Sequence, residues 1–175
     1  LQYEFGINKD LDNIPCVLKP IELVNEKDLK AIQFENFDGV SLDTYLSSTV
    51  SFDIRYFLTI ALQITEAIEE IHGKQYVLRN ISDKKFLIKK DTLEIKVLGF
   101  DLATKLQEEL LPNFDIEKFS GNVHYIAPEQ TGKIDSPVDY RCDLYALGVL
   151  FYKILTKILP YESLKDPHSI MYAKI

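Results

Sequence analysis

The clearest pattern along the chain is a set of apolar residues recurring with the period of a helix. The pattern predicts an amphipathic helix whose apolar face is formed by Ile54, Phe57, Leu58, Ala61, Ile64, Ala67, Ile68 and Ile71. Ser51 is expected to cap its start, with Asp53 in the first turn, and Gly73 is expected to end it. A second helix is predicted from about Tyr140 to Leu155. That stretch is apolar all round, which predicts a buried helix, through Leu144, Leu147, Leu150, Phe151 and Ile154.

Shorter alternating stretches predict strands before and between these helices. Residues 17–24 and 29–35 mix β-forming and polar residues around a turn at 25–28, which predicts a hairpin. Residues 86–88 and 95–98 predict two further strands around a turn at 90–92. Residues 1–11 are expected to end a helix, and residues 169–175 to start one. A small sheet region followed by a mostly helical region predicts an α+β fold, with the boundary near residues 39–46.

Composition and charge exclude some classes of partner and site. The net charge is −7, which argues against nucleic acid or an anionic membrane as the main partner. Cys16 and Cys142 lie far apart and predict neither a disulfide framework nor a metal site, so a reducing, cytoplasmic setting is expected. No apolar run is long enough to span a bilayer. The chain begins with Leu1 and its only methionine is Met171, so we expect a segment of a longer protein.

Two motifs in the second half of the chain carry a family resemblance. Residues 121–129 read GNVHYIAPE, and Asp143 opens the run DLYALGV. Together with LTKILPY at 155–161, they resemble the end of the activation segment and the start of the buried central helix of eukaryotic-type protein kinases. The resemblance implies structural roles for Glu129 and for Asp143, which would pin the backbone of the catalytic loop.

The resemblance covers nearly the whole chain and implies a bilobal, protein-kinase-like α+β fold, truncated at both ends. The chain would be a single incomplete domain, with residues 1–39 as a remnant of the small lobe and hinge and residues 40–175 as the helical lobe. Glu4 falls on the ion-pairing glutamate of the family, a structural position. The hinge residues Phe34, Glu35 and Phe37 would contact a nucleotide, with Phe34 at the gating position. The family's Gly-rich loop and nucleotide-binding lysine would precede Glu4 and are not in this chain.

The catalytic-loop motif of the family, H-R-D-x-x-x-x-N, is altered here. Asn80 stands at the catalytic Asp position, and a carboxamide has no useful basicity. Lys85 stands at the metal-binding Asn position, where a cation would repel Mg²⁺. Ser82 replaces a phosphate-contacting lysine. Two interpretations of Lys85 stay open: a solvated lysine at a strand edge, or an ammonium that stands in for the metal charge and holds a nucleotide without Mg²⁺.

The family's D-F-G motif reads Gly99-Phe100-Asp101. Gly99 lies at the nucleotide site but has no side chain with which to bind a metal, whereas Phe100 keeps a structural position. Asp101 lies two residues further on and would face the same side of an extended chain, although the plainer interpretation is an exposed residue at the start of a loop. The sequence therefore predicts no metal site. ATP is a candidate cofactor, and Mg²⁺ is not expected.

These replacements predict a catalytically impaired, pseudokinase-type signalling module that acts by protein interaction or allostery. Its partners would be proteins or other domains of the same longer chain. The main alternative is a serine/threonine kinase that transfers phosphate from ATP to protein with unorthodox residues. A decaying gene segment is a third interpretation, against which the intact apolar pattern of both long helices argues.

Three further expectations are more specific. Residues 127–132, with Asp166-Pro167, resemble kinase domains at the N-terminus of bacterial hybrid signalling proteins that also carry an ATPase module and a sensor histidine kinase. Arg79 is interpreted as a structural salt-bridge residue, with a phosphate sensor as the alternative. Thr104 and Ser120 are candidate phosphorylation sites by position alone.

Overall fold

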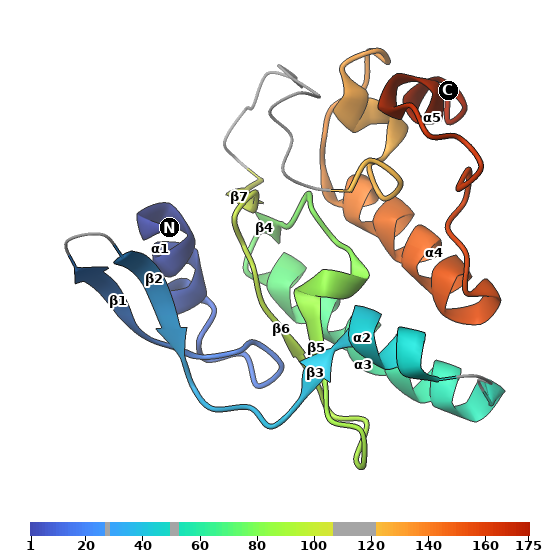
Figure 1. Cartoon of the computed structure of the whole chain (residues 1–175). Coiled ribbons are helices and arrows are strands. Elements are labelled where there is room, and N and C mark those ends of the chain that lie inside the picture. Colours follow the sequence, from blue (N-terminus) through green and yellow to red (C-terminus); the bar gives the residue numbers. More distant parts are fainter. Residues whose placement is uncertain (27–28, 50–52, 107–121) are drawn as a thin grey trace. The chain divides into compact units, whose positions relative to one another are not determined.

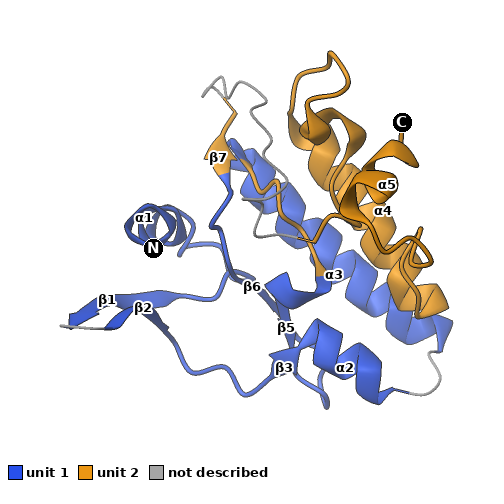
Figure 2. Cartoon of the chain, turned by 45° about the horizontal axis from the view of Figure 1, so that its top comes forward, with its two compact units in different colours: residues 1–76, 83–103 blue, residues 77–82, 104–175 orange. Residues whose placement is uncertain are grey.

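The computed structural model describes residues 1–26, 29–49, 53–106 and 122–175 (Figure 1). The chain divides into two compact units (Figure 2): unit 1 contains residues 1–76 and 83–103, and unit 2 contains residues 77–82 and 104–175. The two units differ in extent from the expected lobes, 1–39 and 40–175, and that division stays a prediction.

Unit 1 contains a hairpin and a small sheet, both antiparallel. The expected hairpin is present: β1 (Pro20–Glu26) pairs with β2 (Leu29–Phe34), with Leu23 opposite Ile32. The sheet has the order β3-β5-β6, formed by β3 (Val40–Ser41), β5 (Phe86–Ile88) and β6 (Ile95–Val97). Buried residues alternate with half-buried ones along β5 and β6. One face of the sheet is therefore turned into the core.

Three helices complete unit 1: α1 (Gln2–Asp10), α2 (Leu42–Ser48) and α3 (Ile54–Gly73). The helix α3 ends at Gly73 as expected, but its buried face differs from the prediction. Ile54 and Leu58 are 57% and 58% exposed. Ile60, which the pattern did not assign to the apolar face, is fully buried. A helix turns by about 100° per residue, so Ile54 and Leu58 point away from the face formed by Ile60, Ile64, Ala67, Ile68 and Ile71.

The start of α3 also differs from the expectation. Asp53 is the N-cap and does not lie in the first turn: its carboxylate accepts the Arg55 N–H at 2.9 Å and contacts the Arg55 guanidinium at 2.7 Å. These contacts, together with the positive end of the helix, lower the pKa of the Asp53 carboxyl below its ordinary value. Ser51, the expected cap, lies outside the described residues.

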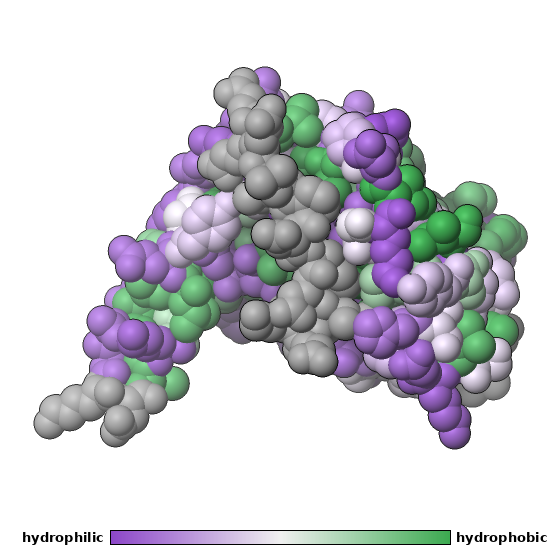
Figure 3. Space-filling model, turned by 90° about the horizontal axis from the view of Figure 1, so that it is seen from above, coloured by the Kyte–Doolittle hydropathy of each residue, from purple (hydrophilic) through white to green (hydrophobic). Residues whose placement is uncertain are grey.

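Unit 2 is built on α4 (Tyr140–Thr156), with the short helices η2 (Pro128–Thr131) and α5 (Pro167–Tyr172). A small core forms where Val77, Ala127 and Cys142 pack together. The prediction that α4 is apolar and buried all round is wrong at Leu144, which is 58% exposed. Leu155, on the same helix, is exposed as well. The face of the molecule drawn in Figure 3 carries both hydrophobic and strongly hydrophilic side chains.

Two further contacts order unit 2. The strand β4 (Tyr76–Val77), whose second residue belongs to this unit, pairs with β7 (Thr104–Lys105). Lys174 donates hydrogen bonds to the carbonyls of Val123, His124 and Ile126 at 2.6–2.8 Å. Burial lowers the pKa of Lys174 to about 8. In the described parts of the chain, no helix has the length and hydropathy needed to cross a bilayer.

The observed face of α3 leads to a test by substitution. We expect Ile64→Ala to lower the free energy of unfolding by about 2–5 kcal/mol, because a fully buried side chain leaves a cavity. Leu58→Ala on the same helix is the matched control and should change it by less than about 0.5 kcal/mol. Denaturant melts of both variants measure the difference. Equal losses would show that α3 does not present the face described here.

Candidate functional site

In unit 1, the chain brings Lys85 and the turn at residues 99–101 together. Lys85 ends the short helix η1 (Asp83–Lys85), and its carbonyl accepts the Leu98 N–H at 3.0 Å. This bond holds the start of β5 beside the end of β6. The Lys85 ammonium then donates to a carboxylate oxygen of Asp101 and forms an ion pair with it. The side chains are 19% and 34% exposed, so Lys85 is not the solvated strand-edge lysine of the plainer interpretation.

Gly99 is required by its backbone and by its neighbour. Its φ of +78° lies in the left-handed region that glycine adopts readily. A Cβ atom at this position would lie 2.8 Å from both Cδ and Nζ of Lys85. The lysine side chain therefore occupies the space that a side chain at residue 99 would need.

Glu4 of α1 belongs to the same cluster. Its carboxyl lies near the backbone of Phe100, whose side chain is buried. Burial raises the pKa of Glu4, and the Asp101 charge raises it further, whereas Lys85 and the Phe100 N–H lower it. The neighbouring Tyr3 hydroxyl donates to the Ala103 carbonyl at 3.0 Å. The helix α1 thus contacts the 99–103 turn at two points.

The donor set of this cluster does not fit a divalent metal ion. Mg²⁺ needs several oxygen ligands in octahedral geometry. Lys85 and Gly99 stand at the two positions expected to supply such ligands, and Asp101 is already engaged by an ammonium. In the parts of the chain that the structure describes, no group of His, Cys, Asp or Glu side chains is arranged to hold a metal ion.

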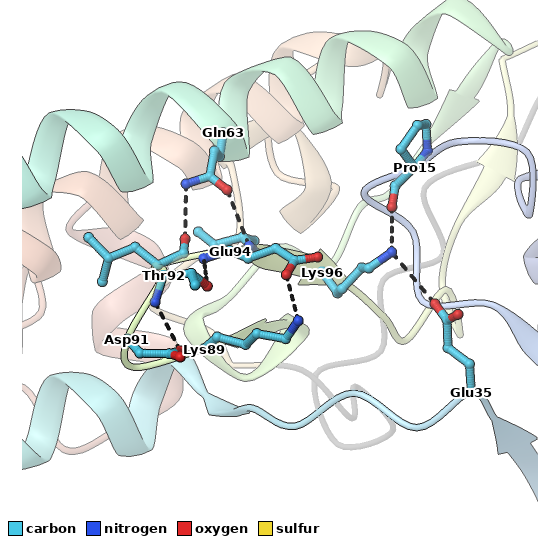
Figure 4. Close-up of polar contacts among 10 residues, drawn as sticks. Pro15, Glu35, Gln63, Lys89, Asp91, Thr92, Glu94 and Lys96 are labelled. Carbon is cyan, nitrogen blue, oxygen red and sulfur yellow. Dashed lines mark hydrogen bonds and ion pairs between the residues drawn. The ribbon is translucent and has the colours of Figure 1, made fainter.

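The expected hinge follows β2, and its side chains contact residues from other parts of unit 1. The Glu35 carboxylate accepts the Lys19 N–H at 3.2 Å and lies 3.5 Å from the Lys96 ammonium, which also donates to the Pro15 carbonyl (Figure 4). The Phe37 ring lies against Gly39, and the Lys89 ammonium is 4.9 Å from its centroid. Phe34, the last residue of β2, is half-buried. Glu35 and Phe37 therefore hold the hinge in place through their side chains. Their backbone groups take part as well, because the Glu35 N–H donates to the Lys19 carbonyl at 2.9 Å and the Phe37 carbonyl accepts the Gly39 N–H at 2.8 Å.

Gln63 of α3 is a structural residue that the sequence pattern did not indicate. Its amide donates to the Leu93 carbonyl at 2.9 Å and accepts the Ile95 N–H at 3.2 Å (Figure 4). The Lys89–Glu94 ion pair closes the same turn at 2.6 Å. Together these contacts fix the turn between β5 and β6. The strand β6 then leads directly into residues 99–101.

In unit 2, the expected catalytic loop is held by two side chains. The buried Asp143 carboxylate accepts the N–H groups of Leu78 and Arg79, each at 2.8 Å. Gln130 donates to the Arg79 carbonyl at 2.8 Å, and its amide oxygen accepts the Ala127 N–H at 3.0 Å. The backbone N–H and the backbone carbonyl of Arg79 are thus both hydrogen-bonded. Its φ of +63° is unusual for a residue with a side chain. Sequence reasoning did not single out Gln130, although it directly follows the Ala-Pro-Glu motif.

Asn80 directly follows Arg79 in this loop and is half-buried. A carboxamide can donate or accept a hydrogen bond there but cannot take a proton from a hydroxyl. Leu78 and Ser82 are buried on either side of it in the chain. Glu129 lies half-buried in η2, and Thr104 lies half-buried in β7. Ser120, the other candidate phosphorylation site, lies outside the described residues.

Comparison with known proteins agrees with this geometry. The family model for the protein kinase domain matches residues 1–174. Serine/threonine-protein kinase PrkC of Bacillus subtilis is 31% identical over 150 residues, which cover 85% of this chain and 22% of that protein. Calcium-dependent protein kinase 3 of Plasmodium yoelii yoelii is 28% identical over 170 residues, covering 96% and 30%.

A third relative is the RAF proto-oncogene serine/threonine-protein kinase of Xenopus laevis, 26% identical over 148 residues, covering 83% of this chain and 23% of that protein. The chain therefore spans less than a third of the length of each of these relatives. The α+β architecture, the match over nearly every residue and the kinase relatives lead to one assignment. This chain belongs to the protein kinase domain family.

Proposed function

We propose that this domain is a catalytically impaired, pseudokinase-type signalling module that works by binding protein partners or other domains of the same longer chain. The observation that carries the proposal is the Lys85 side chain, which lies over Gly99 and is paired with Asp101. Kinases accelerate phosphoryl transfer by positioning the substrates and by stabilising charge with bound metal ions. Because the Lys85 ammonium is paired with Asp101, that carboxylate is already engaged and does not serve as a ligand for such an ion.

The replacement of the catalytic base supports the same function. Asn80 stands where the family has an aspartate, and its amide has no basicity with which to accept the substrate proton. Loss of a single catalytic group commonly lowers the rate by about 10³-fold or more. The contacts that shape the loop are kept, since Asp143 and Gln130 still hold Arg79. A maintained scaffold without its chemistry suits a domain that is selected for binding.

The second candidate function is a serine/threonine kinase with surviving activity, and the relatives favour it, because several are serine/threonine kinases by name. In either case ATP is a candidate ligand at the hinge, residues 34–37. The resemblance to hybrid proteins with an ATPase module and a sensor histidine kinase suggests that the interacting domains lie on the same chain. We place the domain in signal transduction on that basis.

The proposal predicts no phosphate transfer at a kinase-like rate. Labelled ATP should give no transfer, to the full-length protein itself or to generic protein substrates, with either Mg²⁺ or Mn²⁺. Ordinary kinases turn over at about 1–100 per second, and a rate in that range would rule the proposal out. A mock preparation from cells that lack the protein serves as the control, because a signal that it also gives comes from a contaminating kinase.

A second prediction concerns Asp143, which serves the fold and not the chemistry. Asp143→Ala should lower the free energy of unfolding by about 1–3 kcal/mol for each backbone N–H that it leaves buried without an acceptor. Asp143→Asn keeps one acceptor and should lose less. Asp135→Ala, an exposed acidic residue nearby in the sequence, is the control for charge and should have little effect. Denaturant melts in which Asp143→Ala is as stable as the wild type would contradict the loop-holding role.

A further inference from the structure

We propose that the Lys85 ammonium is a tethered cation that takes the place of a divalent metal ion and holds the 99–103 turn against α1 without any ligand. The inference rests on the proposed function, because it explains how a domain without metal ligands keeps this region ordered. It goes further by giving Lys85 a positive role and by coupling that role to two other residues, Gly99 and Asp101.

The charges around Lys85 show why a cation is needed there. Asp101 and Glu4 are both carboxylates, and the charge of Asp101 acts on Glu4. Two carboxylates held close together repel one another, and burial strengthens that repulsion. The Lys85 ammonium contacts Asp101 directly and also acts on Glu4. One positive charge therefore offsets part of two negative ones.

The identities of Gly99 and Lys85 depend on each other, because the lysine side chain lies where a side chain at residue 99 would be. A Cβ at residue 99 would lie 2.8 Å from Nζ of Lys85, closer than real Cβ atoms come to their neighbours. The lysine reaches Asp101 by crossing a residue without a side chain. A side chain at 99 would therefore force the lysine to move, and a change at either position alone is expected to disturb the other.

The same ammonium stabilises the attachment of α1. The Tyr3 hydroxyl donates to the Ala103 carbonyl at 3.0 Å, and the neighbouring Glu4 carboxyl lies near the Phe100 backbone. If Asp101 were not neutralised, its charge would repel Glu4 and weaken this contact between α1 and the turn. The position of α1 on the turn is thus set by charges that the protein itself carries, in the absence of metal or nucleotide.

The first test measures metal response in the full-length protein, with MgCl₂ and MnCl₂ as the probes. We expect neither Mg²⁺ nor EDTA to shift the melting temperature through Asp101, so Asp101→Asn should respond to both as the wild type does. Mn²⁺ should not broaden the amide resonances of residues 99–101. Broadening of those resonances that Asp101→Asn abolishes would overturn the tethered cation. This measurement needs no variant at Lys85.

The second test compares two neighbouring lysines. Lys85→Gln removes the ammonium and should lower the melting temperature by about 2–6 °C. Lys84→Gln makes the same charge change at an exposed residue and should leave it unchanged. Lys85→Gln combined with Asp101→Asn should be no less stable than Lys85→Gln alone, because the pair is already broken. Indistinguishable melting of the two lysine variants would refute the proposal.

The third test addresses the contact over Gly99. Gly99→Ala should lower the melting temperature in the wild type and lower it less in a Lys85→Ala background, where only the backbone strain remains. Equal losses in both backgrounds would show that Lys85 does not cross Gly99. Phosphate transfer measured in EDTA would overturn the proposed function and leave the tethered cation standing. Mg²⁺ bound through Asp101 without transfer would do the reverse.

Discussion

The contact between the Lys85 ammonium and the Asp101 carboxylate constrains the residues around it. The lysine crosses residue 99 so closely that a Cβ there would lie 2.8 Å from its Nζ, and Gly99 leaves that space open in a left-handed conformation. The charges of Asp101 and Lys85 both act on the pKa of Glu4, which lies near the same turn. Lysine, glycine and aspartate at these three positions are therefore linked by geometry, and none of them is explained by considering its position alone.

The positions at which the family has an aspartate in its motifs fall into two groups: one keeps the aspartate here and the other does not. Asp143 is buried, and its charge is satisfied by two backbone N–H groups, so it shapes the loop that carries Asn80. Carboxylates that would have held metal or accepted a proton have been replaced, at Asn80 and Gly99. Backbone-binding carboxylates are costly to lose because the donors they satisfy remain buried. If the domain binds no metal, as we propose, carboxylates at the metal-binding positions have no role to keep, which would account for the pattern.

The sequence predicted local structure well because helix and strand periods are local properties. The hairpin of β1 and β2, the strands β5 and β6, the end of α3 at Gly73 and the extent of α4 followed from local sequence. Periodicity did not show which apolar residues other elements cover, so Leu58 and Leu144 were assigned to buried faces and are exposed. The motif positions located Asn80, Lys85 and Gly99. The partner of Lys85, however, lies 16 residues away, and the roles of Gln63 and Gln130 depend on backbone groups 30 or more residues distant.

The hydrogen bonds of Asp143 also bear on the order in which the chain folds. Leu78 and Asp143 are 65 residues apart, so the loop between them must close before the carboxylate can meet its two donors. Helix α3 and the β5–β6 pair involve neighbours in sequence and have little such entropy to overcome. Until the long loop closes, the Asp143 carboxylate is hydrated and pays no desolvation energy. Arg79 then has no hydrogen bond to Asp143 that would stabilise its left-handed conformation. The strained backbone at Arg79 is therefore a late product of folding, imposed by a partner that the chain supplies only after its local elements have formed.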